Sequence, residues 1–158
     1  MQENTCCFLG HRTINETEEL KSKTSEIIEK LIVEENVDTF LFGSKSRFNS
    51  LCLELVTKLK EKYPHIKRIY VRAEYPQIDD SYLAYLLKYY EDTYYPTTAI
   101  GAGKTVYLKR NYEMIDKSRF CIFYYNEECL PSNRKSGTRL ALDYAVKKNK
   151  KIFALPLS

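Results

Sequence analysis

Short apolar runs alternate along this chain with longer segments in which apolar residues recur every three or four positions. A continuous apolar run of four to eight residues between turn residues is typical of a strand buried on both faces. Five such runs predict strands: TCCFLG at 5–10, DTFLFG at 38–43, IKRIYVR at 66–72, RFCIFYY at 119–125 and KIFAL at 151–155.

The segments between these runs have helical periodicity. A stripe from Leu20 to Leu31 marks the first helix, and Asn15 with Glu18 three residues later predicts a capping box at its start. A second stripe extends from Phe48 to Leu59. Further helices are predicted over 80–91, 104–117 and 136–148.

Strands that alternate with helices predict an α/β fold with a parallel sheet covered on both faces. Right-handed crossovers then favour a doubly wound, Rossmann-like sheet of about five strands in the order 3-2-1-4-5. The chain has no repeat or low-complexity segment, so we expect a single domain over 1–158. The irregular stretch 92–104 is the candidate lid.

The string IGAGKTV at 100–106 contains half of a phosphate-binding loop motif. The full motif has a further glycine five positions before the second one, and Thr98 occupies that position. The preceding residues end in Pro96 and lack a strand pattern. We therefore interpret the string as a connection into helix 104–117 and expect no Mg²⁺-dependent triphosphate hydrolysis.

The charge balance narrows the choice of ligand. Lys and Arg number 25 against 21 Asp and Glu, a net charge of +4, which suits an anionic ligand and is weak for a nucleic-acid-binding surface. No apolar stretch approaches the 18 residues of a membrane span, and MQEN lacks the basic start of a secretory signal. We expect a cytoplasmic protein without a membrane partner.

The cysteines favour the same compartment. Four of the five lie in apolar runs or stripes, which predicts buried free thiols in a reducing environment: Cys6, Cys7, Cys52 and Cys121, with Cys129 as the fifth. Their spacing lacks the paired cysteines and histidines of a zinc site, so no metal site is expected.

In a doubly wound sheet the ligand lies at the carboxyl ends of the strands, where the strand order reverses. Gly10–Arg12 and Ser136–Thr138 flank that point, and Gly43–Ser46 lies beside it. Each loop combines small residues and hydroxyls at a helix start, where free N–H groups and the helix dipole favour a phosphate. Nearby cations would neutralise its charge: Arg12, Lys45, Lys135 and Arg139.

Each of these features also has a structural explanation. Glycine after a strand is ordinarily a turn residue, and Ser46 or Ser136 is ordinarily a helix cap. His11 alone is more typical of a packing or capping residue, so Arg12 is the stronger ligand candidate. The tyrosines of helix 80–91 are more often core residues than a platform for a base. Three similar loops at one edge together favour a phosphorylated ligand.

Four stretches in order along the chain resemble the SLOG superfamily, and more narrowly its YpsA-like branch of small bacterial and phage proteins. They are CCFLGHR, FLFGSKSRFNSLCLELV, YLKRNYEMIDKSRFCIFYYN and KSGTRLALDYAVKKNKKI. The superfamily includes LOG phosphoribohydrolases, the DNA-uptake protein DprA and sensor domains for NAD-derived signals such as cyclic ADP-ribose. The resemblance implies a Rossmann-like pocket for a nucleotide or nucleotide-derived ligand.

The resemblance also implies which residues bind. By position, the family's motifs fall on the following residues of this chain: Gly10, His11 and Arg12, the loop Gly43, Ser44 and Lys45 through Phe48, the pair Arg110 and Asn111, and the phosphate loop Ser136, Gly137 and Thr138. Two departures matter. The second loop lacks most of the family's glycines and has Asn49 in place of its aspartate, and Ala141 stands where LOG enzymes have a glutamate, with Asp143 the nearest acid.

Cleavage of an N-glycosidic bond needs a carboxylate, so the loss of that glutamate argues against the LOG reaction. The first hypothesis is a binding module, a sensor or sequestering protein, for a nucleotide or an ADP-ribose- or NAD-derived ligand, with no required cofactor. The second is a nucleotide N-glycosidase or transferase that uses Glu74, Asp79 or Asp80. Single-stranded DNA binding, by analogy with DprA, is the third and is disfavoured by the weak net charge. Related proteins often pair through helices, so a homodimer is expected.

Overall fold

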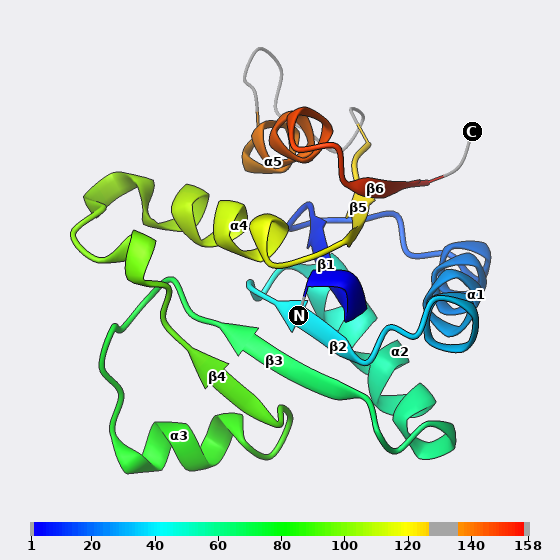
Figure 1. Cartoon of the computed structure of the whole chain (residues 1–158), viewed down its shortest axis with the longest axis horizontal. Helices are drawn as coiled ribbons and strands as arrows, with labels where there is room; N and C mark the ends of the chain where they lie inside the picture. The colour runs from blue at the N-terminus through cyan, green and yellow to red at the C-terminus, as the bar shows by residue number, and fades with distance from the viewer. Residues whose placement is uncertain (1, 127–135, 157–158) are drawn as a thin grey trace.

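Parallel strands alternate with helices in the computed structural model, which describes residues 2–126 and 136–156. The strands are β1 (Thr5–Gly10), β2 (Thr39–Phe42), β3 (Lys67–Val71), β4 (Asp92–Tyr94), β5 (Phe120–Tyr124) and β6 (Lys151–Leu155). The α-helices are α1 (Glu18–Glu34), α2 (Arg47–Lys62), α3 (Asp80–Leu86), α4 (Val106–Asp116) and α5 (Gly137–Lys147). Short 3₁₀ helices are η1 (Gln2–Asn4), η2 (Thr97–Ala99) and η3 (Gly103–Thr105). The predicted α/β fold with a Rossmann-like parallel sheet is confirmed (Figure 1).

The strand order is β4-β3-β2-β1-β5-β6, so the sheet has six strands instead of about five, and the five predicted strands keep their predicted order within it. The added strand, β4, pairs in parallel with β3 and forms one edge of the sheet. It was missed because three residues are too few to show a periodicity. Helix 80–91 was predicted too long: α3 ends at Leu86, and the chain turns back toward β3 with Glu91 N–H donating to the Arg68 carbonyl at 2.8 Å.

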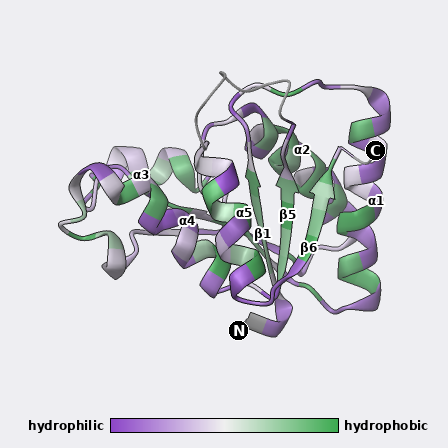
Figure 2. Cartoon of the chain, turned by 90° about the horizontal axis from the view of Figure 1, so that it is seen from above, coloured by the Kyte–Doolittle hydropathy of each residue, from purple (hydrophilic) through white to green (hydrophobic). Residues whose placement is uncertain are grey.

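The two faces of the sheet pack against different helices. Side chains alternate along each strand, so Phe8 of β1 lies in the cluster with α1 and α2, while Leu9 lies in the cluster with α4 and α5. Figure 1 shows these helix pairs on opposite sides, and Figure 2 shows β1, β5 and β6 as hydrophobic strands between them. Burial on both faces explains why the central strands β1, β2 and β5 are almost continuously apolar.

Side-chain caps begin four of the helices. The capping oxygen belongs to Thr17 in α1, Ser46 in α2, Asp79 in α3 and Ser136 in α5. The predicted capping box at Asn15 is wrong, since Thr17 accepts from Leu20 N–H at 3.0 Å and Glu18 is already the first helical residue. Asn15 N–H donates instead to the Tyr124 hydroxyl.

The expected buried thiols are confirmed for Cys6, Cys7, Cys52 and Cys121, which are free and fully enclosed. Cys129 lies outside the described residues. Over the described part of the chain, no helix has the length and apolar character needed to cross a membrane.

Candidate functional site

A cavity of about 1100 Å³ opens at the carboxyl ends of β1, β2 and β3. We call it the central cavity. Its wall includes every residue predicted to contact a ligand: Gly10, His11, Arg12, Gly43, Ser44, Lys45, Arg110, Asn111, Ser136, Gly137 and Thr138. The fold therefore brings four separate sequence segments to one hollow, with α4 facing the ends of the strands. Of the two other cations considered, Arg139 is not part of the wall and Lys135 lies outside the described residues.

Arg110 is the most enclosed cation of the cavity. Only 5% of its surface is exposed. Its Nε donates to Asn111 Oδ1 at 2.9 Å, and its guanidinium lies 5.7 Å from the centre of the Tyr107 ring. It forms no ion pair with another described residue. Burial lowers the pKa of Arg110 to about 10, so the side chain remains charged at neutral pH, and Glu74 attracts it only from beyond ion-pair distance.

Gly43 makes room for this arginine. A Cβ at position 43 would stand 2.4 Å from Met114 Sδ and 2.7 Å from Arg110 Cδ. Contacts that short do not occur between real side chains, so any larger residue at the end of β2 would displace the arginine. The glycine thus lets Arg110 cross the end of the strand and reach the cavity.

Asn49, where the family pattern has aspartate, holds the loop that follows β2. Its Oδ1 accepts from Gly43 N–H and its Nδ2 donates to Ser46 Oγ, both at 3.2 Å. Ser46 Oγ also accepts from Asn49 N–H as the cap of α2, and Ser44 Oγ donates to it at 2.9 Å. Asn49 is 4% exposed, so its amide shapes the loop from beneath rather than from the solvent side.

Close packing against α2 explains why residue 10 is a glycine. A Cβ there would lie 2.4 Å from the ring of Phe48 in the first turn of α2. The close approach of α2 to the end of β1 therefore requires this glycine, whether or not a ligand also lies against it.

His11 has a packing role, the alternative that the sequence favoured over a role in catalysis. Its Nε2 accepts from Asn126 N–H at 2.9 Å, and its ring meets Tyr124 edge-on at 5.8 Å. Burial lowers its pKa, so the imidazole is neutral with its proton on Nδ1. His11 lines the cavity but presents no charge to it.

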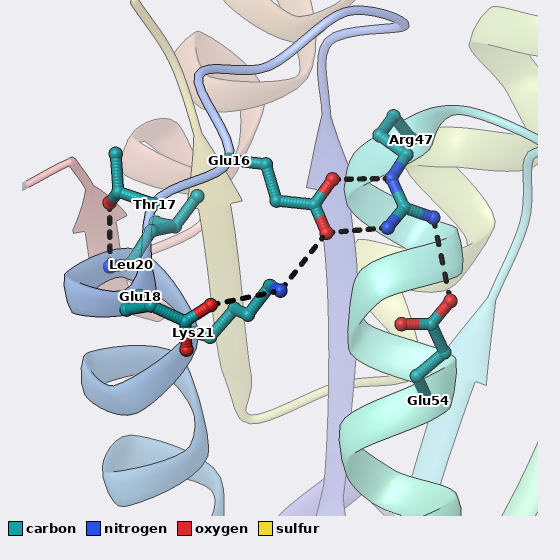
Figure 3. A network of polar contacts seen from close by, with 7 residues as sticks. All are labelled: Glu16, Thr17, Glu18, Leu20, Lys21, Arg47 and Glu54. Carbon is teal, nitrogen blue, oxygen red and sulfur yellow. Dashed lines mark hydrogen bonds and ion pairs between the residues drawn. The ribbon is translucent and has the colours of Figure 1, made fainter.

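The loop after β1 is tied to α2, which fixes the backbone at Arg12. Arg47 N–H donates to the Arg12 carbonyl at 3.1 Å. The Arg47 side chain forms a forked pair with Glu16, with Nε 2.7 Å from Oε2, and reaches Glu54 at 3.4 Å (Figure 3). Hydrogen bonding from Arg47 lowers the pKa of Glu16. Lys21 also contacts Glu16, so the anchor carries several charges.

The start of α5 also lines the central cavity. Ser136 Oγ accepts from Arg139 N–H at 3.0 Å, which identifies it as the helix cap. A Cβ at Gly137 would meet no atom within 4 Å. The glycine is therefore not required by the fold itself, in contrast to Gly10 and Gly43.

One carboxylate and two tyrosines complete the cavity. Glu74 lines it and accepts a hydrogen bond from the Tyr107 hydroxyl at 2.7 Å. Asp79 and Asp80 do not line it, and Asp79 is occupied as the cap of α3. Tyr70 and Tyr107 were not predicted as site residues, since tyrosines spaced through a helix or strand carry no signal that distinguishes a cavity wall from a core.

The charge of the wall is positive. Arg12, Lys45 and Arg110 face one carboxylate, Glu74, and no ion pair joins any of the three cations to a residue in the described ranges. The half-motif 100–105 contributes nothing to this wall. Its glycines Gly101 and Gly103 have φ values of 73° and 58°, a backbone conformation that explains them without a phosphate.

Within residues 2–126 and 136–156, no group of three His, Cys, Asp or Glu side chains is placed to hold a metal ion. No protein-family model matches the chain, and no curated protein is significantly similar to it.

Proposed function

We propose that the protein is a binding module for a nucleotide or nucleotide-derived small molecule whose phosphate lies in the central cavity. Arg110 is the single observation that carries the proposal. A guanidinium that is 95% enclosed and forms no ion pair with a described residue, with Glu74 acting on it only from a longer distance, is unfavourable until an anion pairs with it.

The rest of the wall suits a phosphate. Arg12 and Lys45 are exposed at the rim, where they can contact the ligand without being buried beforehand. Arginine makes paired, charge-assisted hydrogen bonds to phosphate oxygens. The start of α5 adds backbone N–H groups and the positive end of a helix dipole.

Calorimetry with AMP and ADP-ribose tests the proposal. We expect Arg12→Ala to weaken binding by roughly 1.5–3 kcal/mol, the value of a lost charge-assisted contact. Lys104→Ala is the matched control, because Lys104 is an exposed cation of η3 outside the cavity, and its affinity should stay within a few-fold of the parent. A folded parent that binds neither compound would refute the proposal.

An N-glycosidase is the second candidate, and the position of Glu74 in the cavity is the observation that favours it. Such an enzyme needs a carboxylate beside the sugar to stabilise positive charge or to activate water. Incubation with NAD, AMP and ADP-ribose separates the two functions. Released base that disappears in Glu74→Gln would establish the enzyme, and no released base is expected for the binding module.

A further inference from the structure

A second groove, of about 310 Å³, lies beside the central cavity. Five tyrosines line it, Tyr70 from β3 and Tyr82, Tyr85, Tyr89 and Tyr90 from α3 and the turn after it. We call it the tyrosine groove. Ser44, Lys45, Asn49 and Tyr70 belong to the walls of both hollows, so the groove adjoins the cavity directly.

Tyr85 and Tyr89 are not core residues, contrary to the expectation from the sequence, whereas Tyr70 and Tyr90 pack against the core. Leu86 is the buried residue of α3, whereas Tyr85 and Tyr89 are 52% and 47% exposed. A seven-residue helix at the edge of the sheet has few neighbours to cover it. The aromatic surface therefore remains open to a ligand.

The tyrosine rings pack in pairs. Tyr70 and Tyr90 are partly buried, with ring centres 5.2 Å apart, and Tyr90 packs against Phe42 of the core. Tyr82 and Tyr85 have nearly parallel rings whose centres are 6.2 Å apart. Exposed aromatic faces of this kind stack on planar rings.

The tyrosine hydroxyls of the groove are available to a ligand. None of the five hydroxyls donates a hydrogen bond to another described residue. A tyrosine hydroxyl is a donor at neutral pH, and burial raises the pKa of Tyr70 further. Lys45 is the only charged residue of the wall that the structure describes. Aromatic faces, neutral hydroxyls and little charge suit an uncharged heteroaromatic ring with polar edges.

We infer that the tyrosine groove holds the base of the nucleotide whose phosphate lies in the central cavity. The inference rests on the proposed function, since Ser44 and Lys45 of the loop after β2 belong to the walls of both hollows. Stacking tolerates different bases because each has a π-face. The groove therefore selects for a base as such, with larger purines favoured over pyrimidines.

Calorimetry with AMP, UMP and ribose 5-phosphate tests the inference, because the last compound keeps the phosphate and the sugar but lacks the base. The parent should bind AMP most tightly and ribose 5-phosphate most weakly. Tyr85→Ala and the double variant Tyr82→Ala/Tyr85→Ala should weaken AMP binding, by about ten-fold for the double variant, and leave ribose 5-phosphate unchanged. Tyr85→Phe, which keeps the ring, should bind AMP within a few-fold of the parent.

Leu83→Ala is the matched control, since Leu83 is an exposed residue of α3 outside the groove. Equal affinity of the parent for AMP and ribose 5-phosphate would overturn the base site and leave the phosphate cavity standing. Parallel losses for both compounds in the tyrosine variants would also overturn it, because the effect would then be structural. A parent that binds neither compound would overturn the proposed function as well. The comparison of ligands on the parent needs no variant to fold.

Discussion

The neighbours of Arg110 hold its guanidinium in place but form no ion pair with it. Gly43 leaves space beneath it, Asn111 accepts from its Nε, and the Tyr107 ring lies beside it. Its lowered pKa has the same origin as its proposed function, since the burial that disfavours the charge also excludes the water that would compete for an anion.

Arg110→Met should therefore separate stability from binding. Removing an unbalanced buried charge is expected to raise the free energy of unfolding of the ligand-free protein, by roughly 1–2 kcal/mol. The same change should abolish measurable binding of AMP. Urea unfolding and calorimetry check the two effects. A destabilised variant would show that the existing contacts of Arg110 already compensate its charge.

His11 makes stability depend on pH. Its folded pKa lies below the unfolded value of 6.5, so the unfolded chain binds more protons in acid. The stability that it contributes is present above pH 6.5 and is lost as the pH falls toward the folded pKa. In urea titrations between pH 7.5 and 5, the parent should lose more stability than His11→Gln, whose amide oxygen can still accept from Asn126. Identical slopes would contradict a buried neutral imidazole.

At the scale of elements, the cavity depends on how helices begin. The caps of α2 and α5 both lie in its wall, and the loop before α2 is braced by Asn49. Each cap uses an oxygen of the side chain to hold the first turn, while other groups of the same turn face the cavity. Structural and proposed ligand roles thus coexist within single loops.

The start of α5 allows these roles to be tested separately. Gly137→Val should fold, because its Cβ would meet no atom, and it should abolish AMP binding if the new side chain occupies the space of the phosphate. Ser136→Ala should lose about 1 kcal/mol of stability, the value of a cap, and some affinity if its hydroxyl also contacts phosphate. Thermal unfolding and calorimetry measure both. AMP binding to Gly137→Val at the parent's affinity would place the phosphate elsewhere.

At the scale of the whole molecule, helices cover both faces of the sheet at its central strands β1, β2 and β5. The reactivity of the thiols measures this coverage, because Cys6 and Cys52 are buried in the core on one side of the sheet and Cys7 and Cys121 in the core on the other. Burial raises the pKa of Cys6 and of Cys52 well above the usual value for a thiol, which suppresses the reactive thiolate.

A Cys129→Ser variant should accordingly resist Ellman's reagent at pH 8. We expect the four remaining thiols to react no faster than global unfolding, and to react fully in denaturing urea. The time course of absorbance at equal protein concentration, with and without urea, measures this. Rapid reaction of one thiol in native buffer would reveal a local opening of the sheet.

The sequence by itself determined the α/β class, the five longer strands and the loops of small and hydroxyl-bearing residues at one edge. Burial on both faces leaves a continuous apolar run, and connection by helices constrains the strands to be parallel, so both features are visible in linear order. The same reasoning selected three of the loops that line the central cavity, because loops at the carboxyl ends of parallel strands must meet, whereas Arg110 and Asn111 followed from the family resemblance.

Only the tertiary structure decided what each of those residues does. Gly10 and Gly43 look alike in the sequence, yet one is required by Phe48 and the other by Arg110. The tyrosines of α3 have a helical pattern that usually indicates a core, and their exposure follows from the short helix lying at the sheet edge beside β4. Steric fit and exposure depend on residues distant in the chain, which local periodicity does not encode.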